Sequence, residues 1–373
     1  MQFSDLTLYL TEECNFKCSY CYQTRGHNHL NTEEMVDFIH FLLPHLTETF
    51  HLNFYGGEPL LFFGLIQKAV LIAEVMGGDQ GKTPRFGLTT NGSLLEDSII
   101  HFLNEHHFSV TVSYDGLSQD GLRHPETGNL IKSHIEKIKK HTAIRLEVNS
   151  VFTPESVKTF AQSMKEMLEW GVGNFSFALD ISHPWTDETI SQLDEQLDSY
   201  REDLLTFTLK NVYIPLASFK SPVSKGFYRC TAGEKSLVLA PDGCVYGCFL
   251  FVDLFRTQIH TDLQDHFCLG NLNGFKRHFP DLEIKIAKTY GRLWMNTFHT
   301  QEMLCADCPE LMVCKICPVE SAFITQSLGK IPAMQCRIAK CLRKHKKMFW
   351  DALQEKAGLK YFELLQDSKS LLF

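Results

Sequence analysis

The chain has 373 residues, of which 44% are hydrophobic and 21% are charged, which is the composition of an ordinary globular protein. The formal net charge of −8 gives the surface no general attraction for nucleic acid or an anionic membrane, so we expect neither as a partner. The N-terminus lacks the features of a signal peptide, and no apolar run approaches the roughly 20 residues of a membrane helix. A cytoplasmic location is therefore expected.

Short apolar segments alternate with amphipathic segments from residue 5 to about residue 180. The expected strands are 6–11, 51–55, 85–90, 109–113, 145–151 and 174–179. The expected helices between them are 33–47, 62–76, 95–106, 128–141 and 155–170. Strand–helix units joined by short links predict parallel strands covered by helices. The fold class is therefore α/β, a partial TIM-like (β/α)6 barrel whose active site lies at the carboxyl ends of the strands.

The chain changes character after the barrel. A polar amphipathic stretch at 187–210 is followed, from Cys230 onward, by hairpins, loops and clustered cysteines. We expect a barrel domain at 1–215, a small cysteine-rich domain at 216–345 and a C-terminal helical tail at 346–373. Because the second region lacks a large apolar core, we expect metal to stabilise it.

The cysteines are unevenly distributed. Of 13, three lie between positions 14 and 21 and ten lie between positions 230 and 341. A disulfide framework is not expected in a cytoplasmic chain of this size. Metal or iron–sulfur binding is the better interpretation.

The first group, Cys14, Cys18 and Cys21, is a CxxxCxxC run directly after the first expected strand. Three thiolates on one loop can hold three irons of a 4Fe–4S cubane and leave the fourth iron open, whereas a simple electron carrier would use four cysteines. The alternative is zinc, but a structural zinc site needs four ligands.

This run, with Tyr20 before its last cysteine, resembles the radical S-adenosylmethionine (SAM) superfamily. The resemblance implies that SAM chelates the open iron and is reductively cleaved to a 5′-deoxyadenosyl radical. The motifs Gly56-Gly57-Glu58-Pro59 and Thr89-Thr90-Asn91-Gly92 end the second and third strands, as in that family. The cofactor-binding residues that the resemblance implies are Tyr20, Gly56, Gly57, Glu58, Asn91, Ser113 and Asn149.

Asp115 and Arg123 follow the fourth expected strand and are the candidates for a catalytic role. The Gly-rich continuation that relatives carry after this segment is only partly kept here. For Arg123, Ser113 and Asn149, a structural role is an open alternative to a binding one.

The second cysteine group resembles the SPASM extension of radical enzymes that modify peptides and proteins. It reads CX12GX4C, then CX2CX5C, then CX2C in place of the usual CX3C. The resemblance implies two auxiliary 4Fe–4S clusters, so three clusters in all. One would use Cys230, Cys248 and Cys317, with Cys244, Cys268 or no residue as the fourth ligand. The other would use the set Cys305, Cys308, Cys314 and Cys336, leaving Cys341 unused; two zinc ribbons are the alternative.

Two auxiliary clusters imply a net oxidation of a peptide or protein side chain, such as a thioether or cyclophane cross-link in a ribosomally made peptide. A formylglycine-forming activity like that of sulfatase maturases is a weaker alternative, because Phe249 stands where those enzymes carry an aspartate. Asp253 lies five residues past Cys248 and would need a shifted strand to take the place of that aspartate. A zinc-stapled, non-catalytic binding protein and an enzyme acting on a small molecule are further alternatives.

The expected partners follow from the same resemblance. They are the peptide or protein substrate and an electron donor such as flavodoxin or ferredoxin. Many relatives carry an N-terminal leader-binding domain, but only 13 residues precede Cys14. We therefore expect either a separate leader-binding protein or a substrate that binds without a leader.

Overall fold

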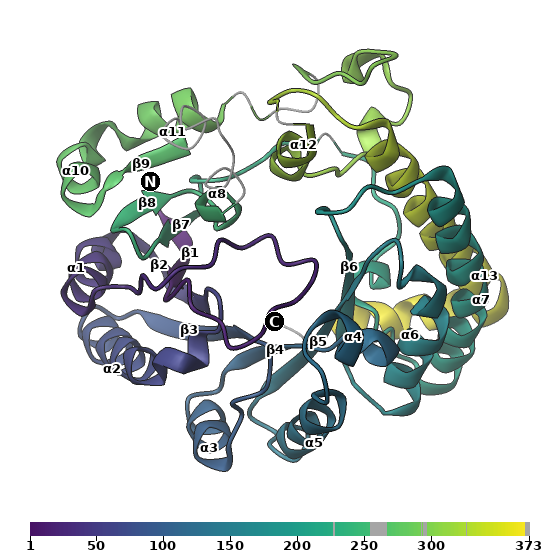
Figure 1. The fold of residues 1–373 in the computed structure, drawn as a ribbon, viewed down its shortest axis with the longest axis horizontal. Helices are drawn as coiled ribbons and strands as arrows, with labels where there is room; N and C mark the ends of the chain where they lie inside the picture. The colour runs from purple at the N-terminus through teal and green to yellow at the C-terminus, as the bar shows by residue number, and fades with distance from the viewer. Residues whose placement is uncertain (227, 254–266, 292, 294–296, 326, 370–373) are drawn as a thin grey trace.

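The computed structural model describes residues 1–226, 228–253, 267–291, 293, 297–325 and 327–369. Residues 370–373 of the expected C-terminal tail and residues 254–266 of the expected cysteine-rich domain lie outside the described residues. The chain forms an open barrel: strands line its interior, helices cover its outer side, and the C-terminal segments span the gap beyond β6 (Figure 1).

The described strands form one nine-stranded sheet in the order β6-β5-β4-β3-β2-β1-β7-β8-β9. Strands β1 to β7 pair in parallel, and β8 and β9 continue the sheet in antiparallel fashion. The bounds are β1 Phe3–Tyr9, β2 Leu46–Tyr55, β3 Thr83–Thr90, β4 Ser109–Ser113, β5 Arg145–Phe152, β6 Phe175–Leu179, β7 Ser236–Leu239, β8 Cys244–Tyr246 and β9 Cys268–Asn271. The predicted α/β barrel of parallel strands is confirmed.

Helices follow the barrel strands as expected. The α-helices are α1 Thr32–Leu42, α2 Phe63–Asp79, α3 Asp97–Glu105, α4 Gln119–Leu122, α5 Gly128–Ile138, α6 Phe160–Glu169, α7 Asp187–Asn211, α8 Leu250–Asp253, α10 Leu272–Arg277, α11 Leu282–Tyr290, α12 Pro318–Thr325 and α13 Ala333–Lys369. The 3-10 helices are η1 Leu43–His45, η2 Pro59–Phe62, η3 Gly116–Ser118, η4 Val157–Thr159, η5 Ala217–Phe219, η6 Phe279–Asp281, η8 Cys305–Asp307 and η9 Leu311–Val313.

The largest difference from the expected elements lies between α1 and β2. The expected helix 33–47 ends at Leu42, and β2 starts at Leu46 instead of His51. Pro44 lies in the intervening 3-10 turn, where it cannot continue an α-helix. The early part of β2 is fixed by pairing with other strands, since Leu46 aligns with Phe3 and Thr49 with Thr83.

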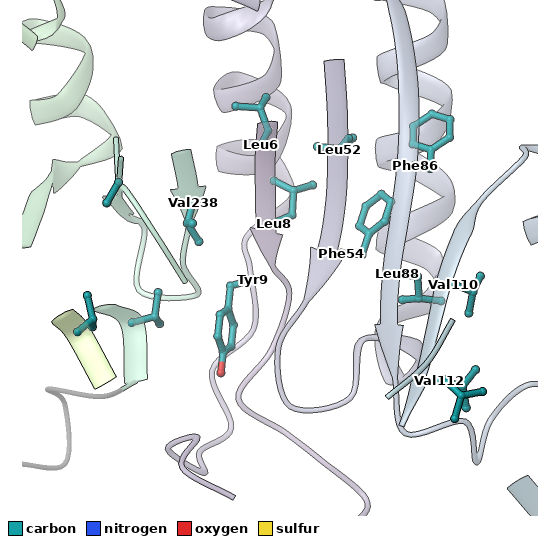
Figure 2. Packing of buried hydrophobic residues seen from close by; sticks show 14 of the residues in the cluster. Leu6, Leu8, Tyr9, Leu52, Phe54, Phe86, Leu88, Val110, Val112 and Val238 are labelled. Carbon is teal, nitrogen blue, oxygen red and sulfur yellow. The ribbon is translucent and has the colours of Figure 1, made fainter. Parts of the chain in front are cut away.

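The barrel core lies between the sheet and its helices. Alternate residues of each strand point to opposite faces of a sheet. The fully buried series in Figure 2, which includes Leu6, Leu8, Leu52, Phe54 and Val112, occupies alternate strand positions. Each such side chain contributes about 1.5–3 kcal/mol through burial. The intervening positions carry polar, half-buried side chains, so the inner face of the barrel is free to hold polar ligands.

Strand β7 belongs to the cysteine-rich part of the sequence but extends the barrel sheet. It pairs in parallel with β1, from Asp5 opposite Ser236 to Leu8 opposite Leu239. A turn then reverses the chain into β8, and Gly243 has the positive φ of +75° that this turn needs. The sheet therefore runs across the predicted boundary at 215/216, and that boundary remains a prediction.

The last long helix, α13, lies along α7 (Figure 1). The side chains of Phe349 and Leu353 are buried, and the Trp350 indole donates a hydrogen bond to the Phe219 carbonyl at 2.9 Å. The expected tail from residue 346 thus starts inside α13 and packs against the barrel domain over at least its first two turns.

One apolar segment of the barrel resembles a membrane span in length and composition. The segment Pro59–Asp79 is long and apolar enough, by length and composition alone, to cross a membrane. It is a barrel helix in this fold: Ile66, Ala69, Val70 and Ala73 are buried against the sheet. One face is thus buried against β-strands, whereas Leu71 and Val75 on this helix are exposed.

Candidate functional site

The loop after β1 carries the first cysteine group across the carboxyl ends of the strands. Its backbone is held against the end of β2, because Gly57 N–H donates to the Thr11 carbonyl and Glu58 N–H donates to the Glu13 carbonyl, each at 2.8 Å. A Cβ atom on Gly56 would lie 2.6 Å from the Thr11 oxygen, and one on Gly57 would lie 2.2 Å from the Glu13 oxygen. Both glycines therefore permit the close approach of the cysteine loop, whatever they contact in a loaded enzyme.

Glu58 links the ends of β2 and β3. Its fully buried carboxylate accepts hydrogen bonds from Leu60 N (3.0 Å), Thr90 Oγ1 (2.8 Å) and Asn91 N (2.7 Å). Burial raises the pKa of Glu58 to about 7, although these donors oppose the shift. Its predicted cofactor contact remains a prediction, and its side chain already fixes the loop that follows β3.

Asn91 in turn fixes the cysteine loop. Its Nδ2 donates to Asn15 Oδ1 at 2.8 Å and lies 3.9 Å from the Cys14 sulfur, while Ser93 N donates to its Oδ1 at 2.9 Å. The Glu58–Asn91–Cys14 sequence of contacts thus ties three strand ends together. Asn91, which the sequence predicts to bind the cofactor, lies beside the predicted cluster ligand.

Asp115 and Arg123, the predicted catalytic candidates, form a buried ion pair. Arg123 Nε lies 2.9 Å from Asp115 Oδ2, and Arg123 Nη2 donates to Asp115 Oδ1 at 3.0 Å. The Tyr20 hydroxyl and the Val151 N–H also donate to the Asp115 carboxylate. The Arg123 guanidinium lies over the Tyr20 ring, 5.4 Å from its centroid. With its carboxylate so fully engaged, Asp115 is placed to hold the cysteine loop through Tyr20, and a direct catalytic role remains a prediction.

Ser113 and Asn149 lie in one polar row across the barrel. Ser113 of β4 is opposite Asn149 of β5, which is opposite Ser176 of β6. The Ser176 hydroxyl donates to Asn149 Oδ1 at 3.0 Å and to Glu147 Oε1 at 2.6 Å. All of these side chains are half-buried, so the row can offer polar contacts to a ligand in the barrel.

The three loop cysteines lie within electrostatic range of one another. Burial raises the pKa of the Cys18 thiol to about 11. The charge of Arg123 acts to lower this pKa, and the charges of Cys21 and Cys14 act to raise it. Burial also raises the pKa of Cys14 and of Cys21. A metal that binds here must therefore displace protons, and iron–sulfur ligation does so.

The residues Cys305, Cys308, Cys314 and Cys336 converge around one cavity. All four line a volume of about 230 Å³. Burial, followed by the charges of Cys336, Cys314 and Cys308, raises the pKa of Cys305 to about 11. The structure thus brings together the complete four-cysteine set that the sequence assigns to one auxiliary cluster.

The spacing of the sulfurs bears on the choice between zinc and a cubane. A tetrahedral zinc ion with Zn–S bonds of about 2.3 Å holds its sulfurs about 3.8 Å apart. Within the described part of the chain, the one group of three ligand atoms that all lie within 4.8 Å of one another is Asp194, Cys341 and His345. No three of the predicted cysteine ligands form such a group among the described residues. None of the thirteen cysteines forms a disulfide, and this donor set fits 4Fe–4S clusters.

The remaining predicted ligands lie near two tyrosines, and Cys248, Cys268 and Cys230 all act on Tyr290. Cys230, Cys248 and Cys317 lie around Tyr228. Burial raises the pKa of Tyr228 to about 12, and the charges of Cys317, Cys230, Glu320 and Cys248 contribute to the same shift. Cys244 and Cys268 instead lie beside each other on β8 and β9. The hydrogen bond from Cys244 lowers the pKa of Cys268 to about 7.

Asp253 lies next to the cysteine loop, although Phe249 occupies the position directly after Cys248. The helical turn α8, and not a shifted strand, brings it there. Its fully buried carboxylate accepts from the Tyr9 hydroxyl at 2.7 Å and from Thr24 N at 3.1 Å. The Phe249 ring packs on Tyr55, with ring centroids 4.6 Å apart.

Apart from Tyr20, sequence reasoning did not single out the tyrosines of this site. The hydroxyls of Tyr22 and Tyr55 lie 2.9 Å apart, and Tyr9 and Tyr55 pack edge to face with centroids 5.7 Å apart. Each stands at a recognisable place, since Tyr9 and Tyr55 end β1 and β2 and Tyr22 follows Cys21. Position at the end of a barrel strand was the available signal.

Comparison with known proteins agrees with this geometry. The family model of the radical SAM superfamily matches residues 8–167. An uncharacterized protein of Methanocaldococcus jannaschii is 26% identical over 295 residues, which cover 77% of this chain and 94% of that protein. The radical SAM cyclopropyl synthase TigE of Paramaledivibacter caminithermalis is 21% identical over 278 residues, which cover 66% of this chain and 57% of TigE.

Solved structures share the fold over nearly the whole chain. The structure of anSMEcpe with bound AdoMet has a TM-score of 0.76 at 18% identity and covers 98% of both chains. The structure of the same protein with AdoMet and the Cp18Cys peptide has a TM-score of 0.74 at 18% identity, covering 94% of this chain and 99% of that one. Streptococcus suis SuiB bound to its precursor peptide SuiA has a TM-score of 0.57 at 15% identity, covering 90% of this chain and 76% of SuiB.

The strand-end motifs, the cysteine loop held by Glu58 and Asn91, and the match over residues 8–167 all lie in the same barrel. The cysteine-rich region that follows completes a fold shared with anSMEcpe. Residues 8–167 of this chain therefore match the radical SAM superfamily.

Proposed function

We propose that this protein reductively cleaves SAM to a 5′-deoxyadenosyl radical and oxidatively modifies a side chain of a peptide or protein. A thioether or cyclophane cross-link in a ribosomally made peptide is the product class we favour. A cytoplasmic location, an electron donor such as flavodoxin or ferredoxin and, where the substrate carries a leader, a separate leader-binding protein are parts of this proposal.

One observation carries the choice of a peptide. A cavity of about 850 Å³ lies between the barrel and the cysteine-rich region. It is lined by Asp180 and Trp185 after β6, by Cys317 and Glu320 at the start of α12, and by Ile338 of α13. Its size is that of a site for a large ligand, and its mostly apolar lining suits side chains of a peptide. The peptide complexes of proteins with this fold support the same substrate class.

The arrangement of cysteines supports an oxidation. The Cys14, Cys18 and Cys21 set would hold the cluster that binds SAM, and the two sets in the cysteine-rich region would hold auxiliary clusters. Such clusters, when bound, can accept an electron from a product radical. In the chain itself, Glu58, Asn91, Asp115 and Tyr20 would keep the first loop in place while substrate binds.

The position of Asp253 favours one second candidate, a formylglycine-forming activity. Its buried carboxylate lies beside the Cys21 loop, where it could accept a proton from a substrate. A peptide assay separates the two activities. Conversion of a cysteine to formylglycine removes sulfur from the peptide, whereas a thioether cross-link retains sulfur and removes two hydrogens.

Anaerobic reconstitution tests the proposal. The loaded protein should bind about twelve irons per chain and form 5′-deoxyadenosine when dithionite is added. With a short precursor peptide encoded beside its gene, it should yield a product of lower mass by hydrogen loss. Loaded clusters without any deoxyadenosine would contradict the enzyme assignment, and turnover of a small molecule in place of every peptide would contradict the substrate class.

A further inference from the structure

The segment that follows β6 carries a pair formed by a histidine and a carboxylate. His183 Nδ1 lies 2.5 Å from Asp180 Oδ2. The Asp180 side chain is buried, and its other oxygen accepts a hydrogen bond from Ser182 N at 2.7 Å. The Trp185 indole donates to the Asp180 carbonyl at 2.8 Å. Asp180 is therefore held by the segment around it, and it can fix the orientation of the His183 ring.

The same segment lies between the first cysteine loop and the large cavity. The Ser182 hydroxyl donates to the Tyr20 carbonyl at 3.2 Å, and Tyr20 directly precedes Cys21. His183 lines the cavity of about 850 Å³, and 49% of its side chain is exposed. The imidazole thus borders the proposed peptide site on a segment that is bonded to the loop of the proposed SAM cluster.

The hydrogen bond to the carboxylate decides which nitrogen of His183 can accept a proton. When Nδ1–H donates to a carboxylate, the neutral ring keeps its lone pair on Nε2. Among the described residues, no hydrogen bond engages His183 Nε2. His183 is the only histidine in the cavity lining, where the cations Lys315, Arg343 and Lys346 are donors. Glu320, on α12, is the one carboxylate of this lining outside the pair.

We propose that His183 Nε2 is the base that accepts the proton lost by the substrate, with Asp180 as its positioning residue. The inference rests on the proposed function. In an oxidative cross-link, two substrate bonds to hydrogen break and one carbon–sulfur or carbon–carbon bond forms. One hydrogen leaves as an atom and converts the 5′-deoxyadenosyl radical to 5′-deoxyadenosine. The other leaves as a proton to Nε2, and its electron reduces an oxidised auxiliary 4Fe–4S cluster.

The first test needs neither SAM nor a substrate. Diethyl pyrocarbonate acylates the unprotonated nitrogen of an imidazole, so mass mapping of the iron-loaded chain measures how available each lone pair is. In Asp180→Asn, Ser182 N–H retains the amide oxygen, so the amide N–H faces His183 Nδ1 and the ring proton moves to Nε2. Acylation of His183 should therefore slow by about tenfold.

His106 is the matched control for this measurement. Its Nδ1 lies 2.8 Å from Glu74 Oε1, so it belongs to a similar pair, and neither residue lines the cavity. The acylation rate of His106 should be the same in the wild type and in Asp180→Asn, which also shows that the variant is folded.

The second test uses the iron-loaded chain with SAM, dithionite and a synthetic peptide of the precursor sequence encoded beside the gene. The quantity measured is the cross-linked product formed per 5′-deoxyadenosine. His183→Gln should lower this ratio about 100-fold, because hydrogen abstraction continues while the proton lacks its acceptor. Imidazole should restore about a tenth of the ratio in His183→Gly and should not raise it in the wild type. His106→Gln should leave the ratio unchanged.

Two results would overturn the assignment. One is equal acylation of His183 in the wild type and in Asp180→Asn, and the other is an unchanged product ratio in His183→Gln. A loss of product confined to Glu320→Gln or to Asp253→Asn would assign the proton to that carboxylate instead. Absence of 5′-deoxyadenosine from the wild-type reaction would contradict the proposed function itself, whereas the acylation of His183 would still report its tautomer.

Discussion

The barrel and the cysteine-rich region hold their cysteines by different means. In the barrel, the loop of Cys14 is fixed by Glu58, Asn91 and the buried Asp115–Arg123 pair, all supported by an apolar core. In the region around Cys305 and Cys314, the described helices between residues 297 and 317 are two 3-10 turns of three residues each. We therefore expect the barrel to position its sulfurs by folding and the second region to depend on its proposed ligands for order.

The most direct test of this difference between the two regions is to remove one set of cysteines. Changing Cys14, Cys18 and Cys21 together to Ala should abolish 5′-deoxyadenosine formation and leave about eight irons per chain, because the auxiliary sets lie in another part of the fold. Iron analysis and product chromatography measure both quantities. If iron fell to zero, the three sets would not be independent.

Iron removal should affect the two regions unequally. When a chelator strips the clusters under anaerobic conditions, amide hydrogen exchange in residues 297–317 should rise by about tenfold or more, while β1 to β6 keep their protection. The reason is that few backbone hydrogen bonds and little apolar burial stabilise residues 297–317, so bound metal supplies folding free energy there. Mass spectrometry of peptides from the two regions within one sample provides the internal control. A uniform rise over both regions would show that the barrel also depends on iron.

The buried ion pair should be the most sensitive polar contact of the barrel. Asp115→Ala leaves the Arg123 guanidinium buried without its partner, which should lower the free energy of unfolding by about 3–5 kcal/mol. Asp351→Ala removes the exposed Lys347–Asp351 pair and should cost no more than about 1 kcal/mol. Urea denaturation of the iron-loaded proteins compares them. Equal losses would mean that the Asp115 pair does not act as a buried one.

Glu58 should make barrel stability depend on pH. Burial raises its pKa from 4.5 to about 7, so the folded chain keeps a proton that the unfolded chain has lost. The free energy of unfolding should therefore fall as pH rises from about 4.5 to about 7 and stay level above, by at most about 3 kcal/mol.

Glu58→Gln cannot ionise and should remove this slope. The quantity to measure is the difference in unfolding free energy between wild type and variant at each pH, so that other titrating groups cancel. Glu48→Gln, at an exposed position of the same strand, is the control and should leave the slope in place. If the unfolding free energy of Glu58→Gln fell with rising pH as steeply as that of the wild type, the assignment of the pH dependence to Glu58 would be contradicted.

The smallest expected effect concerns the two thiols outside the cluster sets that we propose. Since Cys244 lowers the pKa of Cys268 to about 7, Cys268 should be the thiol that iodoacetamide alkylates first at pH 7 in the loaded protein. Cys244→Ser should slow this modification by roughly tenfold, because it removes the thiol hydrogen bond. Peptide mapping gives the rate. Full protection of Cys268 by iron loading would instead indicate that it is a ligand.

Local pattern determined much of the barrel. Alternating apolar residues placed β4 at 109–113 as observed. The resemblance of the cysteine spacing to the SPASM pattern singled out the set of Cys305, Cys308, Cys314 and Cys336 that the fold gathers around one cavity. Both signals repeat over a few residues, so the sequence contains them without knowledge of the fold.

The tertiary structure alone decided which distant residues meet. Strand β7 joins β1 across more than 200 positions, Tyr9 meets Asp253 at a separation of 244, and Tyr20 meets Asp115 at a separation of 95. A four-residue strand and a single carboxylate carry no periodic signal. Their roles come from long-range packing, which is fixed only when the whole barrel closes around its core.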